Sequence, residues 1–451
     1  MVQGSGFTGQ GSGFEVEGSA AFACSESHAS SGEPGQDELL TKAAEAKRAS
    51  LVLARASTED KNRALTSIAR AIRAHEAAIL AANAQDCSLA EADSRIEIDR
   101  LRLTPERVAA MARDVDAVAK LADPVGEAFD RTSRPNGLQI SKRRVPFGVV
   151  GVVYESRPNV TSDVAALCLK TGNAVVLRGG KEALESNRAI VQAIRDGLAA
   201  AGLAESAVQL ITSTDRALVS RMLKLREYLD VIVPRGGAGL IQATIENATV
   251  PVIETGAGVC HTYVDRGADA EMALRIVDNA KVRRPTICNA LDTVLVHREI
   301  AASWLPKLAA QWGGRVEMHA DPEAARLLRA PDAQVRPASA ADWGKEFLSL
   351  VAAVKVVDSL DAALDHIRQY GSGHSEAIVT GDPNAADRFL SEVDAAAVFV
   401  NASTQFTDGG EFGLGAEVGI STQKLHARGP MGLKELTTYK WIIEGSGQIR
   451  T

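Results

Sequence analysis

The sequence predicts an α/β fold with two doubly wound parallel-sheet domains and a small protruding arm. Three observations lead to this prediction. Two blocks of the chain alternate short β-branched runs with helical segments, which is the pattern of βαβ crossovers. A chain of 451 residues is too long for one ordinary domain. With 45% hydrophobic and 24% charged residues, it also has enough apolar material for more than one core.

The first 37 residues differ in composition from the rest of the chain. Residues 1–37 are rich in Gly and Ser, and they lack the basic start and apolar core of a signal peptide. We expect this extension to be disordered, because it cannot bury enough apolar surface to offset its chain entropy. Residues 37–122 follow a helical pattern with apolar positions three and four apart. Several antiparallel helices are therefore expected before the break at Asp123-Pro124-Val125-Gly126.

A β-hairpin is expected after these helices. Residues 131–144 are polar and contain Arg134-Pro135-Asn136-Gly137, a strong turn signal with alternating flanks. Near the other end of the chain, residues 408–432 form an expected Gly-rich loop, and residues 436–443 form an expected strand.

The first alternating block begins at residue 147. The run from Phe147 to Tyr154 is continuous and β-branched, as in a strand buried on both faces. Further strands are expected at 174–177, 208–211, 231–233 and 250–253, with helices at 160–170 and 183–200, between 211 and 231, and up to about residue 247. Right-handed crossovers would make this sheet parallel, and its ligands would bind beyond the carboxyl ends of the strands.

A second block of the same kind begins near Cys260. Its expected strands are 261–264, 293–296, 352–357, 377–380 and 397–400, and its expected helices start at residues 270 and 360. We interpret this block as a second α/β domain.

Two glycine-rich turns follow strands of the first block. Arg178-Gly179-Gly180-Lys181 combines close backbone approach with two cations, which suits phosphate and the additional 2′-phosphate of NADP. The second turn, residues 234–239, has the same order of strand, glycines and helix. Tight turns without a ligand remain the alternative at this point.

The five cysteines are Cys24, Cys87, Cys168, Cys260 and Cys288, and none lies in a CxxC or CxH pair. This spacing supports neither a zinc site nor a disulfide framework, and it favours a reducing, cytoplasmic compartment. Cys288 follows Arg283 and Arg284, and nearby positive charge favours a reactive thiolate. From these neighbours alone a buried core cysteine is the more frequent outcome, as expected for Cys87 and Cys168. Cys260 is expected to be structural, because its neighbour His261 would point to the opposite face of a strand.

Charge and composition exclude several kinds of partner. A net charge of −7 argues against a chain built around nucleic acid, and 4% aromatic residues argue against base stacking. No uninterrupted apolar run is long enough to cross a bilayer, so no membrane partner is expected.

A set of motifs from about residue 39 to the C-terminus carries a family resemblance. The matching segments are 145–148, 154–160, 170–181, 234–237, 260–261, 279–281, Arg284-Pro285 with Cys288-Asn289, 408–413 and 421–432. Residues 99–101 and 123–126 fit as well. Together these motifs resemble the γ-glutamyl phosphate reductases, a family within the aldehyde dehydrogenase superfamily.

The resemblance implies an aldehyde dehydrogenase-like fold with defined parts. Residues 38–130 and 146–255 would form an NADP-binding domain, and residues 256–424 a catalytic domain. Residues 131–145 and 425–451 would form an oligomerisation arm, so a homo-oligomer is expected.

The resemblance also implies a reaction centred on Cys288. Its thiolate would attack γ-glutamyl phosphate, expel phosphate and hold the acyl group as a thioester. Hydride from NADPH would then give glutamate 5-semialdehyde, in the second step of proline biosynthesis from glutamate. The labile acyl phosphate would come from glutamate 5-kinase, with channelling between the two enzymes. A thioester accepts hydride and a free carboxylate does not, which gives the covalent step its purpose. No metal ion is expected.

Further site residues are implied by the same resemblance. The oxyanion donors would be the Cys288 backbone N–H with Arg157 or Asn159. The cofactor would contact Arg178, Gly179, Gly180, Lys181, Gly236, Gly237 and, at the nicotinamide ribose, Glu346. The substrate phosphate and α-carboxylate would contact Arg157, Arg284, His426 and Arg428. Glu254 lies where hydrolytic aldehyde dehydrogenases carry a general base, but a reductase gains nothing from hydrolysing its thioester.

Two alternatives stay open on the sequence. One is a hydrolytic, NAD-dependent aldehyde dehydrogenase with Glu254 as its base. The other is a catalytically silent scaffold for glutamate kinase, which the presence of Cys288 beside the glycine-rich turns argues against.

Overall fold

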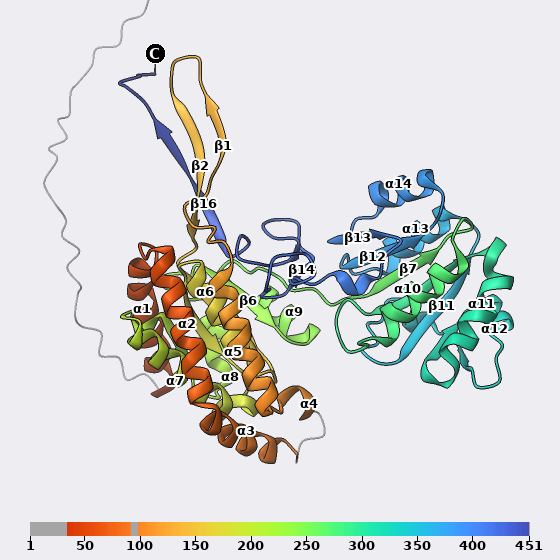
Figure 1. Ribbon diagram of the computed structural model, residues 1–451, viewed down its shortest axis with the longest axis horizontal. Helices are drawn as coiled ribbons and strands as arrows, with labels where there is room; N and C mark the ends of the chain where they lie inside the picture. Colours follow the sequence, from red (N-terminus) through yellow and green to blue (C-terminus); the bar gives the residue numbers. More distant parts are fainter. Residues whose placement is uncertain (1–33, 92–97, 451) are drawn as a thin grey trace, which may run out of the picture.

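The computed structural model describes residues 34–91 and 98–450, which form two lobes and a protruding arm (Figure 1). The expected disorder of residues 1–37 lies almost entirely outside these ranges, as does Cys24. The last residues of that segment belong to a helix, since α1 begins at Pro34.

The first lobe starts with the predicted helices. They are α1 (Pro34–Leu53), α2 (Thr58–Ala74), α3 (Glu76–Ala90), α4 (Ile98–Leu101) and α5 (Pro105–Lys120). Two of them begin at side-chain caps: Ser57 accepts the Asp60 N–H at the start of α2, and Thr104 accepts the Arg107 N–H at the start of α5. The helical prediction for this region is confirmed.

A four-stranded parallel sheet in the order β5-β4-β3-β6 completes this lobe. Its strands are β3 (Val149–Tyr154), β4 (Ala174–Arg178), β5 (Val208–Leu210) and β6 (Val231–Arg235). The helices are α6 (Asn159–Lys170), α7 (Leu184–Ala200), α8 (Arg216–Met222) and α9 (Ala238–Asn247), with 3-10 turns η1 (Lys181–Ala183) and η2 (Glu205–Ala207). Every residue of β3 is buried, as its β-branched run predicted.

The prediction of a strand at residues 250–253 is wrong. Only an isolated bridge forms there, between Val252 and Ile232. Pro251 has no N–H to donate, so this segment cannot extend the ladder as a regular strand.

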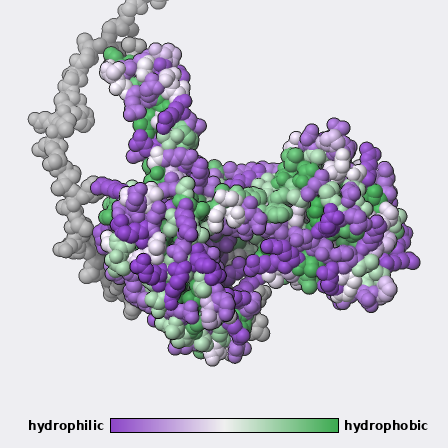
Figure 2. All heavy atoms as spheres, viewed as in Figure 1, coloured by the Kyte–Doolittle hydropathy of each residue, from purple (hydrophilic) through white to green (hydrophobic). Residues whose placement is uncertain are grey.

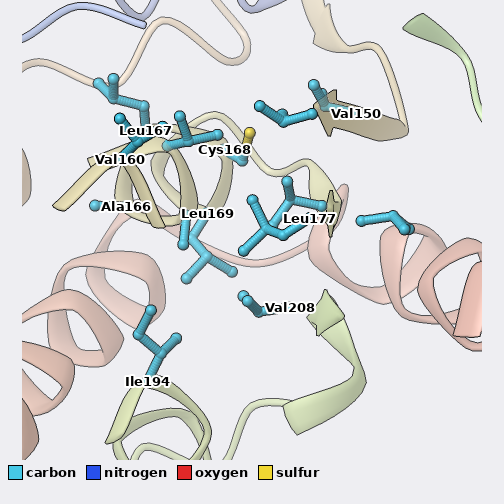
Figure 3. Packing of buried hydrophobic residues seen from close by; sticks show 14 of the residues in the cluster. Val150, Val160, Ala166, Leu167, Cys168, Leu169, Leu177, Ile194 and Val208 are labelled. Atoms are coloured by element: carbon cyan, nitrogen blue, oxygen red, sulfur yellow. The ribbon is translucent and has the colours of Figure 1, made fainter. Parts of the chain in front are cut away.

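One hydrophobic core joins the sheet and its helices (Figure 3). Cys168 lies in it on α6, fully buried, and burial raises the pKa of its thiol. Cys87 is buried in a smaller cluster with Ala90 and Leu101. Both cysteines are core residues, as predicted.

The second lobe holds a seven-stranded parallel sheet in the order β10-β9-β11-β8-β7-β12-β13. The strands are β7 (Cys260–Val264), β8 (Leu291–His297), β9 (Glu317–Ala320), β10 (Gln334–Pro337), β11 (Val351–Val357), β12 (Ser375–Val379) and β13 (Ala397–Val400). The helices are α10 (Ala270–Val282), α11 (Arg298–Trp312), α12 (Pro322–Leu327), α13 (Leu360–Tyr370) and α14 (Pro383–Glu392), with 3-10 turns η3 (Gly313–Arg315), η4 (Ala340–Asp342) and η5 (Thr404–Phe406).

Two parallel-sheet lobes confirm the predicted fold class. Strands β9 and β10 were not predicted from the sequence. Each has only four residues, and β10 is mostly exposed, so neither has a continuous β-branched run.

The arm is an antiparallel sheet of β1 (Ala128–Ser133), β2 (Gln139–Pro146) and β16 (Thr437–Glu444). The predicted hairpin turn and C-terminal strand are both present. Before β16 the tail is mostly loop, with one short pair, β14 (Ile420–Ser421) and β15 (Gly429–Pro430). Met431, Leu433 and Leu436 pack into the first core, so the tail crosses that lobe before it enters the arm.

Within the ranges that the structure describes, no helix has the length and apolar composition needed to cross a membrane.

Helix packing in the first lobe depends on Gly197. A Cβ atom at this position of α7 would lie 2.5 Å from Ile68 Cα on α2. We therefore expect Gly197→Ala to destabilise the protein by about 1–3 kcal/mol, measured by thermal unfolding followed by circular dichroism. Gly239→Ala is the control, because no heavy atom lies within 4 Å of the added carbon. Equal stability of the two variants would contradict this prediction.

Candidate functional site

A cavity of about 300 Å³ lies between the two lobes, and residues of both line it. Figure 2 shows a hollow between the lobes on the face in view, bordered mostly by hydrophilic residues. From the first lobe, the segments that follow β3 and β6 reach the cavity, at the carboxyl ends of these strands. From the second lobe come Cys288 and Glu346. This is the expected position for a ligand of a parallel sheet.

Cys288 lies in the connection between α10 and β8, and the loop after β13 holds this connection in place. The side-chain amide of Asn289 donates to the carbonyl oxygens of Gln405 (3.2 Å) and Thr407 (3.1 Å). The Thr404 hydroxyl donates to the Asn289 carbonyl oxygen at 2.7 Å. Three hydrogen bonds to Asn289 therefore hold the backbone next to Cys288 against the loop after β13.

The opposite side of this connection packs against β7 and the residues before it. A Cβ atom on Gly258 would lie 1.5 Å from the Cys288 carbonyl oxygen, so only glycine permits this approach. The Cys260 thiol donates to the same oxygen at 3.3 Å. His261 instead contacts Glu376, with 3.0 Å between Nδ1 and Oε2. Cys260 and His261 thus make separate contacts and do not form a catalytic pair.

Arginines dominate the cationic lining of the cavity. They are Arg100, Arg157, Arg235 and Arg284. Burial, together with repulsion from Arg100 and Arg235, lowers the pKa of Arg157. Four guanidinium groups in one cavity suit a ligand with more than one anionic group.

Carboxylates balance these cations in the same cavity. They are Glu155, Glu346, Asp408 and Glu417. Burial raises the pKa of Glu417 to about 7, and Arg235 opposes this rise. Burial also raises the pKa of the Cys288 thiol to about 12, and among the charged neighbours Arg235 opposes this most.

Six of the site residues named from the sequence line the cavity together: Arg157, Gly236, Gly237, Arg284, Cys288 and Glu346. Glu346 is held where it lies by the Gly258 N–H, which donates to its Oε1 at 2.9 Å. Arg178 ends β4, the strand next to β3, and residues 179–181 follow it at the same edge of the sheet.

The structure does not bring the remaining candidates to the cavity lining. Asn159 is exposed, and its amide donates to Asp163 at 2.9 Å. His426 is hydrogen-bonded to the Glu435 carbonyl oxygen at 2.8 Å, and Arg428 forms an ion pair with Asp394 at 2.5 Å. Glu254 is absent from the lining.

Two cavity arginines were missing from the sequence-based site. Arg235 is the last residue of β6, directly before a glycine-rich turn, and that position could have identified it. Arg100 comes from the short helix α4, nearly sixty residues before the first predicted site residue, and no local pattern indicates its role.

The glycine-rich turns have features that fit a phosphate-bearing cofactor. A Cβ on Gly179 would lie 2.2 Å from the Asn187 side chain, so the backbone packs closely there. The Nε atom of Arg178 is buried and has no hydrogen-bond partner among the described residues. At the N-terminus of α9, the Gly237 N–H donates to the Glu155 carboxylate at 2.8 Å, so this helix end already holds an anionic group.

Comparison with known proteins places the chain among enzymes. Residues 25–324 match the model of the aldehyde dehydrogenase family. The gamma-glutamyl phosphate reductase of Dehalococcoides mccartyi is 55% identical over 417 residues, 92% of this chain and 98% of that protein. The protein of the same name from Moorella thermoacetica is 55% identical over 415 residues, 92% of this chain and 99% of that one. A crystal structure of gamma-glutamyl phosphate reductase from Thermotoga maritima superposes with a TM-score of 0.88 at 47% identity, covering 92% of this chain and all of that one.

A buried ion pair supports both the β7 strand and the Glu346 segment. Asp292 accepts the N–H groups of Cys260 (3.3 Å) and Phe347 (2.9 Å), and Lys281 lies 4.0 Å from it. Burial raises the pKa of Asp292 to about 7 and lowers that of Lys281 to about 8.

We expect Lys281→Met to destabilise the second lobe by about 3–5 kcal/mol, because it leaves a buried carboxylate unpaired. Denaturant unfolding followed by tryptophan fluorescence reports on this lobe, which contains the buried Trp304 and Trp312. Adding Asp292→Asn should recover much of the loss. A double variant no more stable than the single one would argue against the ion pair.

Proposed function

The chain belongs to the aldehyde dehydrogenase family, and we propose that it is a γ-glutamyl phosphate reductase, or glutamate-5-semialdehyde dehydrogenase. It would reduce γ-glutamyl phosphate to glutamate 5-semialdehyde and phosphate with NADPH, in the second step of proline biosynthesis from glutamate. One observation carries the proposal: a single cysteine, Cys288, shares a cavity with four arginines. The extent of identity to reductases of this name supports it.

In this proposal Cys288 is the nucleophile. Its thiolate attacks the γ-acyl carbon, the bond from that carbon to the phosphate oxygen breaks, and the acyl group remains on sulfur as a thioester. The thioester keeps the acyl carbon electrophilic enough to accept hydride, which a free carboxylate does not do. Reduction regenerates the thiolate when the aldehyde leaves.

The arginines would recognise the two anionic groups of the substrate. Arg157 and Arg284 come from different lobes, so a ligand with separated phosphate and α-carboxylate groups can be held between them. His426 and Arg428 lack this support, because their side chains are bound elsewhere. Of the two proposed side-chain oxyanion donors, Arg157 is favoured over Asn159 by its place in the cavity lining.

Aldehyde dehydrogenases use a nicotinamide cofactor, and we assign NADPH to this chain. When bound, the cofactor supplies the hydride. Arg178 and Lys181 would neutralise the 2′-phosphate, while Gly179, Gly180, Gly236 and Gly237 would let the backbone approach the other phosphates. Glu346 would hold the nicotinamide ribose from the second lobe. Residues 38–130 and 146–255 would thus bind cofactor, and residues 256–424 would supply the nucleophile.

The arm, residues 131–145 and 425–451 in this assignment, would join copies of the chain in a homo-oligomer. Tyr439, Trp441 and Ile443 on β16 are exposed, which suits an interface. The described cysteines are all free, which fits the cytoplasm. Channelling from glutamate 5-kinase would protect the labile acyl phosphate from water.

The reverse reaction tests the function directly. Oxidation of glutamate 5-semialdehyde by NADP should require inorganic phosphate, because phosphate must displace the acyl group from Cys288. The appearance of NADPH absorbance measures this, and Cys288→Ala is the inactive control. If oxidation is equally fast without phosphate, the chain is a hydrolytic dehydrogenase.

The cofactor assignment has its own test. Arg178→Ala should weaken NADPH binding by about 10-fold or more, with little effect on NADH, because only NADPH carries the 2′-phosphate. Titration of protein fluorescence with each cofactor measures both affinities. Arg188→Ala, an exposed arginine of α7, should change neither. An equal loss for the two cofactors would indicate a structural role for Arg178.

A further inference from the structure

The nucleophile lies in an environment that opposes its reactive form. Burial raises the pKa of the Cys288 thiol to about 12, so the neutral thiol predominates near neutral pH. Attack on an acyl carbon needs the thiolate. A cation close to the sulfur is therefore needed to stabilise the charge as it forms.

The charged groups around Cys288 are not equivalent. Arg100, Arg157 and Arg284 reach the cavity from α4, the loop after β3 and the loop after α10. Glu155, Glu346 and Asp408 are the acidic groups on the same surface, besides Glu417. Among all of them Arg235 most favours the ionised sulfur, and Glu417 most opposes it.

Arg235 is held in place from several sides. It ends β6, where its carbonyl oxygen accepts the Glu155 N–H at 3.1 Å. The carbonyl oxygen of the preceding residue accepts the Thr255 hydroxyl at 2.8 Å. Its guanidinium lies against Gly419, where a Cβ atom would be 2.3 Å from Nη1 and 2.9 Å from Thr255 Cγ2. The absence of a side chain at Gly419 is what leaves room for the guanidinium.

Glu417 belongs to the same group of residues. It lies two positions before Gly419, lines the cavity, and its Oε2 accepts the Gly409 N–H at 2.9 Å. Arg235 also favours the ionised form of this carboxyl. One guanidinium thus has two candidate anions, a carboxylate and a thiolate.

We propose that Arg235 is the counter-cation of the Cys288 thiolate, and that the Glu417 carboxylate competes with the thiolate for it. Gly419 is a positioning residue, since its missing side chain leaves room for the Arg235 guanidinium in the cavity that Cys288 and Glu417 also line. The proposal deepens the proposed function, and rests on it for the role of the thiolate in attack on an acyl phosphate.

Alkylation of Cys288 by iodoacetamide tests this in the full chain. The reagent consumes thiolate, needs neither substrate nor cofactor, and its site can be located by peptide mass spectrometry, with Cys288→Ala as the blank. At pH 8, Arg235→Gln should slow the alkylation of Cys288 by about 10-fold or more, equivalent to one unit of thiol pKa. Arg235→Lys should retain part of the rate. Glu417→Gln should increase the rate several-fold, since it removes the competing anion.

Two further variants separate charge placement from general damage. Arg226→Gln removes an exposed arginine of the same lobe and should leave the alkylation rate unchanged. Gly419→Ala keeps every charge but displaces the guanidinium, so it should slow alkylation. Combining it with Arg235→Gln should add no further slowing, because both changes remove the same interaction.

The proposal is overturned if a folded Arg235→Gln variant is alkylated at the wild-type rate from pH 7 to 10. It is also overturned if Glu417→Gln slows alkylation. If Arg235→Gln fails to fold, an unchanged alkylation rate in Gly419→Ala would overturn the proposal instead. Phosphate-dependent oxidation of the semialdehyde is a separate measurement. If the alkylation experiment fails, the proposed function still stands. If the oxidation experiment fails, the charge arrangement around Cys288 still stands.

Discussion

The direct packing of the Cys288 carbonyl oxygen against Gly258 is the contact on which the site depends. It brings the connection that carries Cys288 onto the residues just before β7, and any side chain at position 258 would force the two apart. Asn289 fixes the other side of the same connection through the loop after β13. The backbone of Cys288 is therefore held from both sides at the cavity, and such a fixed position suits the role proposed for its thiol.

Charge is nearly balanced around that sulfur, with four arginines and four carboxyl groups on one cavity surface. A buried cysteine without cations nearby would remain a thiol, whereas unopposed cations would repel one another. Burial first, and then repulsion from Arg100 and Arg235, lowers the pKa of Arg157. The carboxyl groups on the same surface reduce this repulsion.

Much of the architecture could be predicted from the sequence. A strand that is buried on both faces has a continuous run of β-branched residues, as β3 does. The short strand β10 at the edge of the second sheet and its neighbour β9 leave no such run. The effect of Pro251 on the first sheet becomes clear only when its neighbouring strand is known. For the site, six residues named from motifs converge on the cavity. His426 and Arg428 do not, since their partners Glu435 and Asp394 are set by tertiary packing that no motif records.

The sequence by itself determined the two parallel sheets, the hairpin, the glycine-rich turns and, through its motifs, the choice of Cys288 as the proposed nucleophile. These features depend on residues close together in the chain, so local pattern carries them. Only the tertiary structure decided which charges surround Cys288. Arg100, Arg235 and Glu417 are far apart in sequence, and they line one cavity because the folded first lobe brings α4, the end of β6 and the C-terminal tail to it. The electrostatic environment of the Cys288 sulfur depends on that sum of charges, and the distances that set it exist only in the folded chain.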